Sequence, residues 1–109
     1  MAFAGLDVGT SGSKLLVYDL EGRVVFRTEG RYAELGENGR RELNPKTVLD
    51  TVFKLLREAG DSCPEPIEAL AVTCLGESVA CLDDKGEALT NSMLTGDVRG
   101  IPETEEVIR

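Results

Sequence analysis

The residues most suited to chemistry form a short loop of small side chains between two opposite charges, Asp7 and Lys14. Two glycines in this loop, Gly9 and Gly12, allow close approach of the backbone to a ligand and positive φ angles. Successive backbone amides in such a turn can bind an anion, and hydroxyl groups add further donors. Lys14 can neutralise phosphate charge, and Asp7 can hold Mg²⁺ through the hydration waters of the ion. The sequence therefore predicts a phosphate site made by Gly9, Thr10, Ser11, Gly12, Ser13 and Lys14.

Two other phosphate-binding patterns do not fit this loop. A Walker loop needs a glycine, four residues and then Gly-Lys-Ser/Thr, whereas Lys14 follows Ser13 and precedes Leu15. A dinucleotide fingerprint needs glycines that open a helix, whereas this loop leads into an expected strand. Spacing alone leaves one alternative open, a polar hairpin loop whose glycines serve turn geometry only.

The elements expected to position the loop are three strands, at residues 2–8, 15–20 and 24–28. The first is short and apolar, as in a strand buried on both faces. The second and third are separated by a tight hairpin turn at residues 19–22. Residues 30–41 are polar and glycine-containing, which predicts an exposed excursion.

A helix is expected to begin after this excursion. Asn44 is suited to cap it and Pro45 to occupy its first position. Apolar residues then recur at helical spacing as far as Gly60, a natural terminator. A buried strand follows at residues 67–73, and a strand–helix–strand order implies a crossover and parallel pairing. Further short strands are expected at residues 79–82 and 91–94, and a helix begins at Pro102.

Composition narrows the classes of partner. The net charge of −8 argues against nucleic acid, whose phosphates would be repelled. No apolar run approaches the roughly 20 residues that span a membrane, and no secretory signal is evident, so a cytoplasmic location is expected. The chain has three cysteines without CxxC spacing and no histidine, which disfavours the common zinc sites and any histidine-dependent triad.

A second block of residues accompanies the loop. It covers residues 71–78, then Leu82-Asp83 and Gly86, and ends with Asp97-Val98-Arg99. Together with residues 6–14 and the turn at 19–22, this block resembles the FGGY carbohydrate kinases, which belong to the actin and sugar-kinase superfamily. The loop alone would be shared with the wider superfamily, whereas the second block makes the resemblance specific. The resemblance spans nearly the whole chain.

What the resemblance implies is an α/β, RNase H-like domain, with three antiparallel strands and a parallel strand reached through a crossover helix. The strand and helix pattern gives the same order independently. The implied activity is ATP-dependent phosphorylation of a sugar or polyol hydroxyl, with ATP and Mg²⁺ as cofactors. Asp7 would organise the metal, and residues 9–14 would hold the ATP phosphates.

The resemblance also implies a substrate site. Gly76 and Glu77 match a sugar-contacting pair, and Asp97 and Arg99 match an Asp-x-Arg element. Thr95 stands where many members have tryptophan, and the Gln-Met-His triplet of xylulokinases is absent. A glutamate at position 77 is similar to the glycerol-kinase branch, which has arginine in place of Gly76, so the substrate stays open. Glu77 as a solvated carboxylate and Asp97–Arg99 as a surface ion pair remain ordinary alternatives.

The family's general base, an aspartate, is expected beyond residue 109, and so no catalytic residue is expected here. The expected helix has no capping residue before the sequence ends at Arg109. Residues 1–109 are therefore expected to form the amino-terminal part of a kinase's first domain. Residues 1–109 alone should then bind nucleotide with a dissociation constant in the millimolar range at best, without turnover. Apolar surface that the rest of the kinase would cover should favour self-association. A non-kinase ATP-binding switch of the same superfamily, and a stand-alone binding module with a polar surface, are the alternatives.

Overall fold

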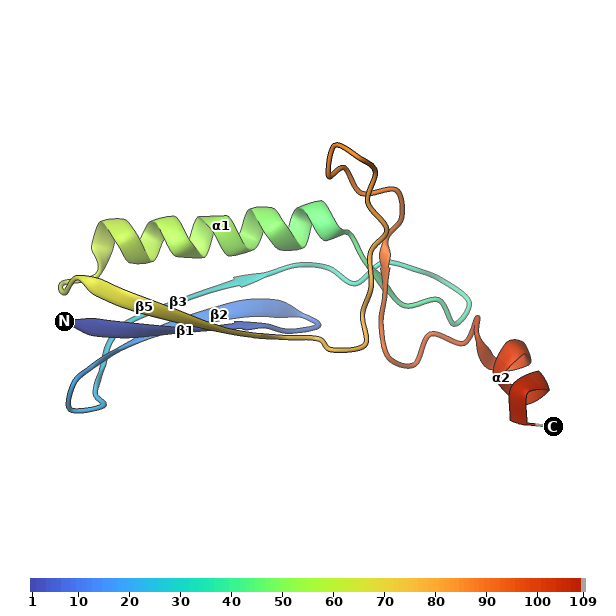
Figure 1. Ribbon diagram of the computed structural model, residues 1–109, viewed down its shortest axis with the longest axis horizontal. Helices are drawn as coiled ribbons and strands as arrows, with labels where there is room; N and C mark the ends of the chain where they lie inside the picture. Colours follow the sequence, from blue (N-terminus) through green and yellow to red (C-terminus); the bar gives the residue numbers. More distant parts are fainter. Residues whose placement is uncertain (109) are drawn as a thin grey trace.

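Alternating apolar residues assemble a four-stranded mixed sheet. The computed structural model describes residues 1–108 and orders the strands β3-β2-β1-β5 (Figure 1). Antiparallel pairs join β1 (Ala2–Val8) to β2 (Gly12–Asp19) and β2 to β3 (Val24–Arg31). β5 (Ile67–Cys74) pairs in parallel with β1 after a crossover through a helix. The expected α/β, RNase H-like order is confirmed.

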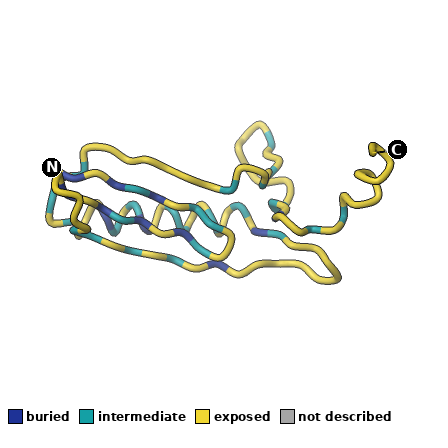
Figure 2. The backbone as a smooth tube through the Cα atoms, turned by 90° about the horizontal axis from the view of Figure 1, so that it is seen from below, coloured by how far each residue is buried: buried dark blue, intermediate teal, exposed yellow. Residues whose placement is uncertain are grey.

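The crossover helix, α1 (Pro45–Ser62), covers one face of this sheet. Asn44 caps it, because its side-chain oxygen accepts the Thr47 N–H at 3.1 Å, and Pro45 occupies the first turn as expected. The core lies between α1 and β1–β3, where Figure 2 shows the buried segments beneath the helix. Its buried members are Ala2, Ala4, Leu6, Leu15, Val17, Leu55 and Ala59.

A second, smaller unit stands beyond the loop end of the sheet (Figure 1). β4 (Glu42–Leu43) and β6 (Ser92–Met93) pair antiparallel there. Three buried side chains, Tyr32, Leu43 and Leu94, form its core. α2 (Ile101–Ile108) lies at the far end of the chain and buries no residue, which gives the molecule extents of 55 × 30 × 25 Å.

Several expected boundaries were wrong. β2 begins at Gly12 and not at residue 15, and β3 continues to Arg31 through the excursion predicted from residue 30. α1 continues through Gly60 to Ser62, because the Cys63 N–H still reaches the Ala59 carbonyl at 3.0 Å. The strand expected at residues 79–82 does not form. Only one isolated bridge, Leu82 with Ala88, occurs there, on an exposed turn with no neighbouring strand to extend it.

The helix-side face of β5 is left open. A groove of about 730 Å³ lies between α1 and β5, and its lining is mostly apolar. Leu49 of α1 is 52% exposed there, and Leu70 and Val72 of β5 are 44% and 58% exposed. Within residues 1–108, neither helix is long and apolar enough to cross a membrane.

Candidate functional site

The loop between β1 and β2 is a tight hairpin. The Gly9 N–H donates to the Gly12 carbonyl at 3.0 Å, so the tip consists of Thr10 and Ser11, both exposed. The positive φ angles expected at Gly9 and Gly12 do not occur. Gly12 is required for another reason: a Cβ at this position would lie 2.5 Å from the Gly30 carbonyl oxygen of β3. Close packing of two strands therefore explains this glycine.

Asp7 and Lys14 lie directly opposite each other across β1 and β2. Their register places both on the sheet face that α1 does not cover, and both are exposed. Within residues 1–108 neither forms an ion pair, and Lys14 also lies in register with Glu29 of β3. The structure thus brings a carboxylate, an ammonium group and the hairpin tip to one end of the sheet.

Ser13 lies on the other face of β2. Its side chain is buried, with the residue 2% exposed, and its Oγ lies 3.3 Å from the Tyr32 hydroxyl oxygen. The Ser13 hydroxyl therefore contacts the interior, and the expected phosphate contact through this hydroxyl is not supported by its placement. Tyr32 is the residue that sequence reasoning missed. It falls in the stretch expected to be exposed, yet it is 8% exposed and donates its hydroxyl hydrogen to the Gly9 carbonyl.

Gly76 and Glu77 leave the sheet beside this hairpin, because β5 runs parallel to β1 with Cys74 in register with Val8. Glu77 is exposed and accepts a hydrogen bond from the Thr95 hydroxyl. This hydrogen bond lowers the pKa of the Glu77 carboxyl from its ordinary value. Gly76 has open space around it, with no atom within 4 Å of a Cβ built there.

Asp97 and Arg99 form a bidentate pair. The Asp97 carboxylate accepts the Arg99 Nε–H at 2.9 Å and the Nη2–H at 2.7 Å, and the Arg41 N–H reaches it at 2.9 Å. The Asp97 side chain is 5% exposed, and the Arg99 hydrogen bonds hold the pKa of its carboxyl well below its usual range. Glu42 adds a second contact to Arg99 at 2.6 Å. The pair therefore joins residues 97–99 to β4 and is more buried than a surface ion pair.

Metal-binding groups are sparse in the part of the chain that the structure describes. No cluster of three or more Cys, Asp or Glu residues suited to a metal ion occurs within residues 1–108. A single exposed carboxylate such as Asp7 still fits Mg²⁺, which keeps several water ligands and takes others from substrate phosphates.

Comparison with known proteins identifies the class. The chain superposes on a ligand-bound xylulose kinase from Lactobacillus acidophilus with a TM-score of 0.90 and 25% identity. The superposition covers 98% of this chain and 22% of the xylulose kinase. The chain also superposes on Plasmodium falciparum glycerol kinase with ADP, with a TM-score of 0.86, 20% identity, and coverage of 97% of this chain and 22% of the other. The fold is that of the amino-terminal region of sugar and polyol kinases.

The sequence comparison gives the family. Residues 2–109 match the FGGY family of carbohydrate kinases, N-terminal domain. The chain is 32% identical over 107 residues to a xylulose kinase from Streptomyces rubiginosus, covering 95% of this chain and 21% of that protein. The chain belongs to the FGGY family, and it spans about a fifth of the length of the curated relatives that it matches.

Proposed function

We propose that this chain supplies the phosphate-binding hairpin and one wall of the sugar site in an ATP-dependent carbohydrate kinase. The observation that carries this proposal is the position of Asp7 and Lys14 within a chain of the FGGY family: the two residues are directly opposed at the hairpin, and neither forms an ion pair within residues 1–108. Family membership supports a sugar or polyol as substrate, and the relative with ADP supports ATP as the phosphoryl donor. A cytoplasmic location belongs to the same proposal.

The hairpin would hold the nucleotide by charge and by amide donors. Thr10, Ser11 and Gly12 offer backbone N–H groups, and Thr10 and Ser11 add exposed hydroxyl groups, whereas the Gly9 N–H already donates to the Gly12 carbonyl. Lys14 would neutralise phosphate oxygens, and Ser13 would contribute only through its backbone. Phosphoryl transfer depends mainly on such positioning and charge neutralisation, which makes the arrangement suited to this reaction.

Asp7 would hold Mg²⁺ through water at the same end of the sheet. When bound, such an ion would offset the negative charge that develops on the phosphate oxygens. Asp7 is exposed and forms no ion pair within residues 1–108, so its carboxylate needs no rearrangement to accept such an ion.

On the substrate side, Glu77 would accept hydrogen bonds from sugar hydroxyls, beside the open space at Gly76. Asp97 has little capacity left to accept hydrogen bonds from a sugar. Its carboxylate already accepts four hydrogen bonds, from the backbone and side chain of Arg99 and from the Arg41 N–H. We therefore assign Asp97 and Arg99 a supporting role in this proposal, shaping the wall that carries Glu77. The general base is expected in the part of the related kinases that this chain does not cover.

The substrate side is tested by saturation-transfer NMR with pentoses, hexonates and polyols at millimolar concentration. At least one sugar should receive saturation from the chain, and Glu77→Gln should abolish it. Glu68→Gln is the matched control, because Glu68 is an exposed glutamate of β5 whose carboxylate accepts no hydrogen bond within residues 1–108. Equal loss in both variants, or no saturation of any sugar by the wild-type chain, would contradict the proposal.

A further inference from the structure

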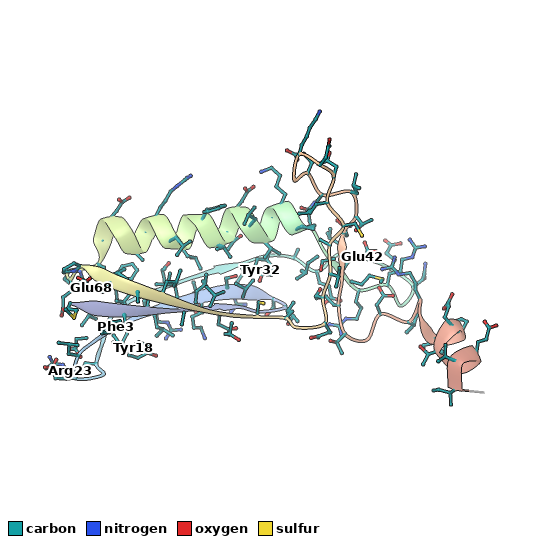
Figure 3. All side chains as sticks on the ribbon, viewed as in Figure 1. Phe3, Tyr18, Arg23, Tyr32, Glu42 and Glu68 are labelled. Atoms are coloured by element: carbon teal, nitrogen blue, oxygen red, sulfur yellow. The ribbon has the colours of Figure 1, made fainter. Side chains whose placement is uncertain are left out.

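Tyr32 contacts the β1–β2 hairpin, the phosphate hairpin of the proposed function, from the side of the sheet that α1 covers. It follows the last residue of β3 and is 8% exposed. Figure 3 labels it between the sheet and α1, near the loop end of β1 and β2. Its hydroxyl donates to the Gly9 carbonyl, and its backbone N–H donates to the Ser11 carbonyl at 3.4 Å. Because a tyrosine hydroxyl has one hydrogen, the Ser13 hydroxyl is the donor in its 3.3 Å contact with Tyr32.

These two contacts fix the direction of two peptide groups. A peptide bond is planar, and in its trans form the C=O and the following N–H point in opposite directions. The Gly9 carbonyl is directed at Tyr32, so the Thr10 N–H points away from it. The Ser11 carbonyl is likewise directed at Tyr32, so the Gly12 N–H points the other way. The Tyr32 hydroxyl therefore sets the orientation of the Thr10 amide at the exposed tip, and the Tyr32 backbone N–H sets that of the Gly12 amide at the start of β2.

The ring of Tyr32 is anchored in the second unit. It packs with Leu43 of β4 and with Leu94, which directly follows β6. Leu94 is adjacent to Thr95, the hydrogen-bond donor to Glu77. One side chain therefore contacts the phosphate hairpin through its hydroxyl group and the substrate-side unit through its ring.

We infer that Tyr32 is a positioning residue for nucleotide phosphate, which orients the hairpin amides and ties them to the unit that carries the Glu77 contact. This inference rests on the proposed function of the hairpin. Tyr32 does not touch the nucleotide itself; it acts through the Gly9 and Ser11 carbonyls.

The test compares Tyr32→Phe with Tyr18→Phe, the substitution at the other of the chain's two tyrosines. Tyr18 lies on the uncovered sheet face and is 37% exposed, and its hydroxyl group forms no hydrogen bond within residues 1–108. Both variants lose one oxygen atom, and Tyr32→Phe keeps the ring between Leu43 and Leu94. The readouts are the dissociation constant for Mg·ATP and the amide resonances of Thr10 and Gly12, both measured by ¹⁵N NMR on the 109-residue chain.

We expect Tyr32→Phe to raise the dissociation constant about fivefold or more, as for partial loss of one hydrogen bond to a charged group. It should also shift the Thr10 amide resonance in the chain without nucleotide, because the hydroxyl contact to the Gly9 carbonyl is lost, whereas Tyr18→Phe should do neither. The Gly12 amide should shift less, because Tyr32→Phe keeps the backbone N–H that contacts the Ser11 carbonyl. Binding by Tyr32→Phe that equals the wild type would overturn the inference and leave the proposed function standing. A wild-type chain that binds no Mg·ATP would overturn the proposed function and the inference with it. If Tyr32→Phe unfolds, Ser13→Ala, which removes the other hydroxyl in this contact, must weaken binding for the inference to survive.

Discussion

Asp7 and Lys14 occupy directly opposed positions on β1 and β2, and neither charge is paired within residues 1–108. Opposite charges across an antiparallel pair normally stabilise the sheet by contact with each other. Here the two side chains stay apart at the end of the sheet where the Thr10–Ser11 tip is exposed. In the proposed function, Mg·ATP, which carries both negative charge and a cation, would use this arrangement.

Removal of the Lys14 charge should weaken nucleotide binding. Lys14→Met is expected to raise the dissociation constant for Mg·ATP about tenfold, because a hydrogen-bonded charge contact to phosphate is lost. Lys85→Met is the matched control, since it changes the net charge equally on an exposed turn remote from β1. If both variants raise the dissociation constant equally, the overall electrostatic field of the chain, and not a contact at Lys14, attracts the nucleotide. The measurement is an NMR titration.

Gly12→Ala should destabilise the fold. The added Cβ would lie 2.5 Å from the Gly30 carbonyl oxygen, so β2 and β3 must separate. We expect a loss of about 1–3 kcal/mol in the free energy of unfolding, measured with urea. Gly5→Ala is the control, because no atom lies within 4 Å of its added Cβ. A Gly12→Ala variant as stable as the wild type would show that the strands are farther apart than described.

Stability should fall in acid in a way that depends on Asp97. Its pKa lies below the ordinary value of 3.8 in the folded chain, chiefly because Arg99 donates side-chain hydrogen bonds to it. The folded state therefore binds fewer protons than the unfolded state, and the stabilisation is present above pH 3.8 and is lost as the pH falls below it.

Asp97→Asn should thus reduce the fall in urea midpoint between about pH 7 and about pH 3. Asp19, whose pKa is lowered chiefly by the Arg23 N–H, retains its own contribution in both proteins. Asp84→Asn, at a carboxylate with no hydrogen bond or ion pair within residues 1–108, should leave the pH dependence unchanged. If Asp97→Asn also leaves it unchanged, the pair with Arg99 does not form in solution.

The open groove between α1 and β5 should cause self-association. Leu49→Glu is expected to reduce both the binding of a hydrophobic dye and the concentration dependence of the sedimentation coefficient, because it places a charge among exposed apolar side chains. Val107→Glu is the control, since Val107 is 85% exposed on α2 and lies outside the groove. A wild-type chain that stays monomeric and binds no dye would contradict this prediction.

The sequence predicted the sheet order because its signals were local. Asn44-Pro45 and the apolar stripe after it specify a helix, and a helix between two buried strands permits few connections. A loop between the first two strands was likewise evident from its glycines and hydroxyl residues, and phosphate binding by this loop stays a prediction. The reason for Gly12 was misjudged, since a close approach by a neighbouring strand leaves no local trace in the sequence.

Tyr32 could not be found from spacing for the same reason. It lies among polar residues, and its burial depends on Leu43 and Leu94, which are distant in sequence. The strand expected at residues 79–82 failed because alternating apolar residues need a neighbouring strand, and residues 83–87 turn there without one. Long-range contacts, and not local propensity, decided these positions.

The central claim, that the hairpin binds nucleotide phosphate, is tested most directly by adding Mg·ATP to the ¹⁵N-labelled chain. The largest amide shifts should fall on residues 9–14 and saturate in the millimolar range. Micromolar affinity would contradict the expectation that residues 1–109 bind nucleotide at most in the millimolar range. The absence of shifts at residues 9–14, or larger shifts on α2, would contradict the claim itself.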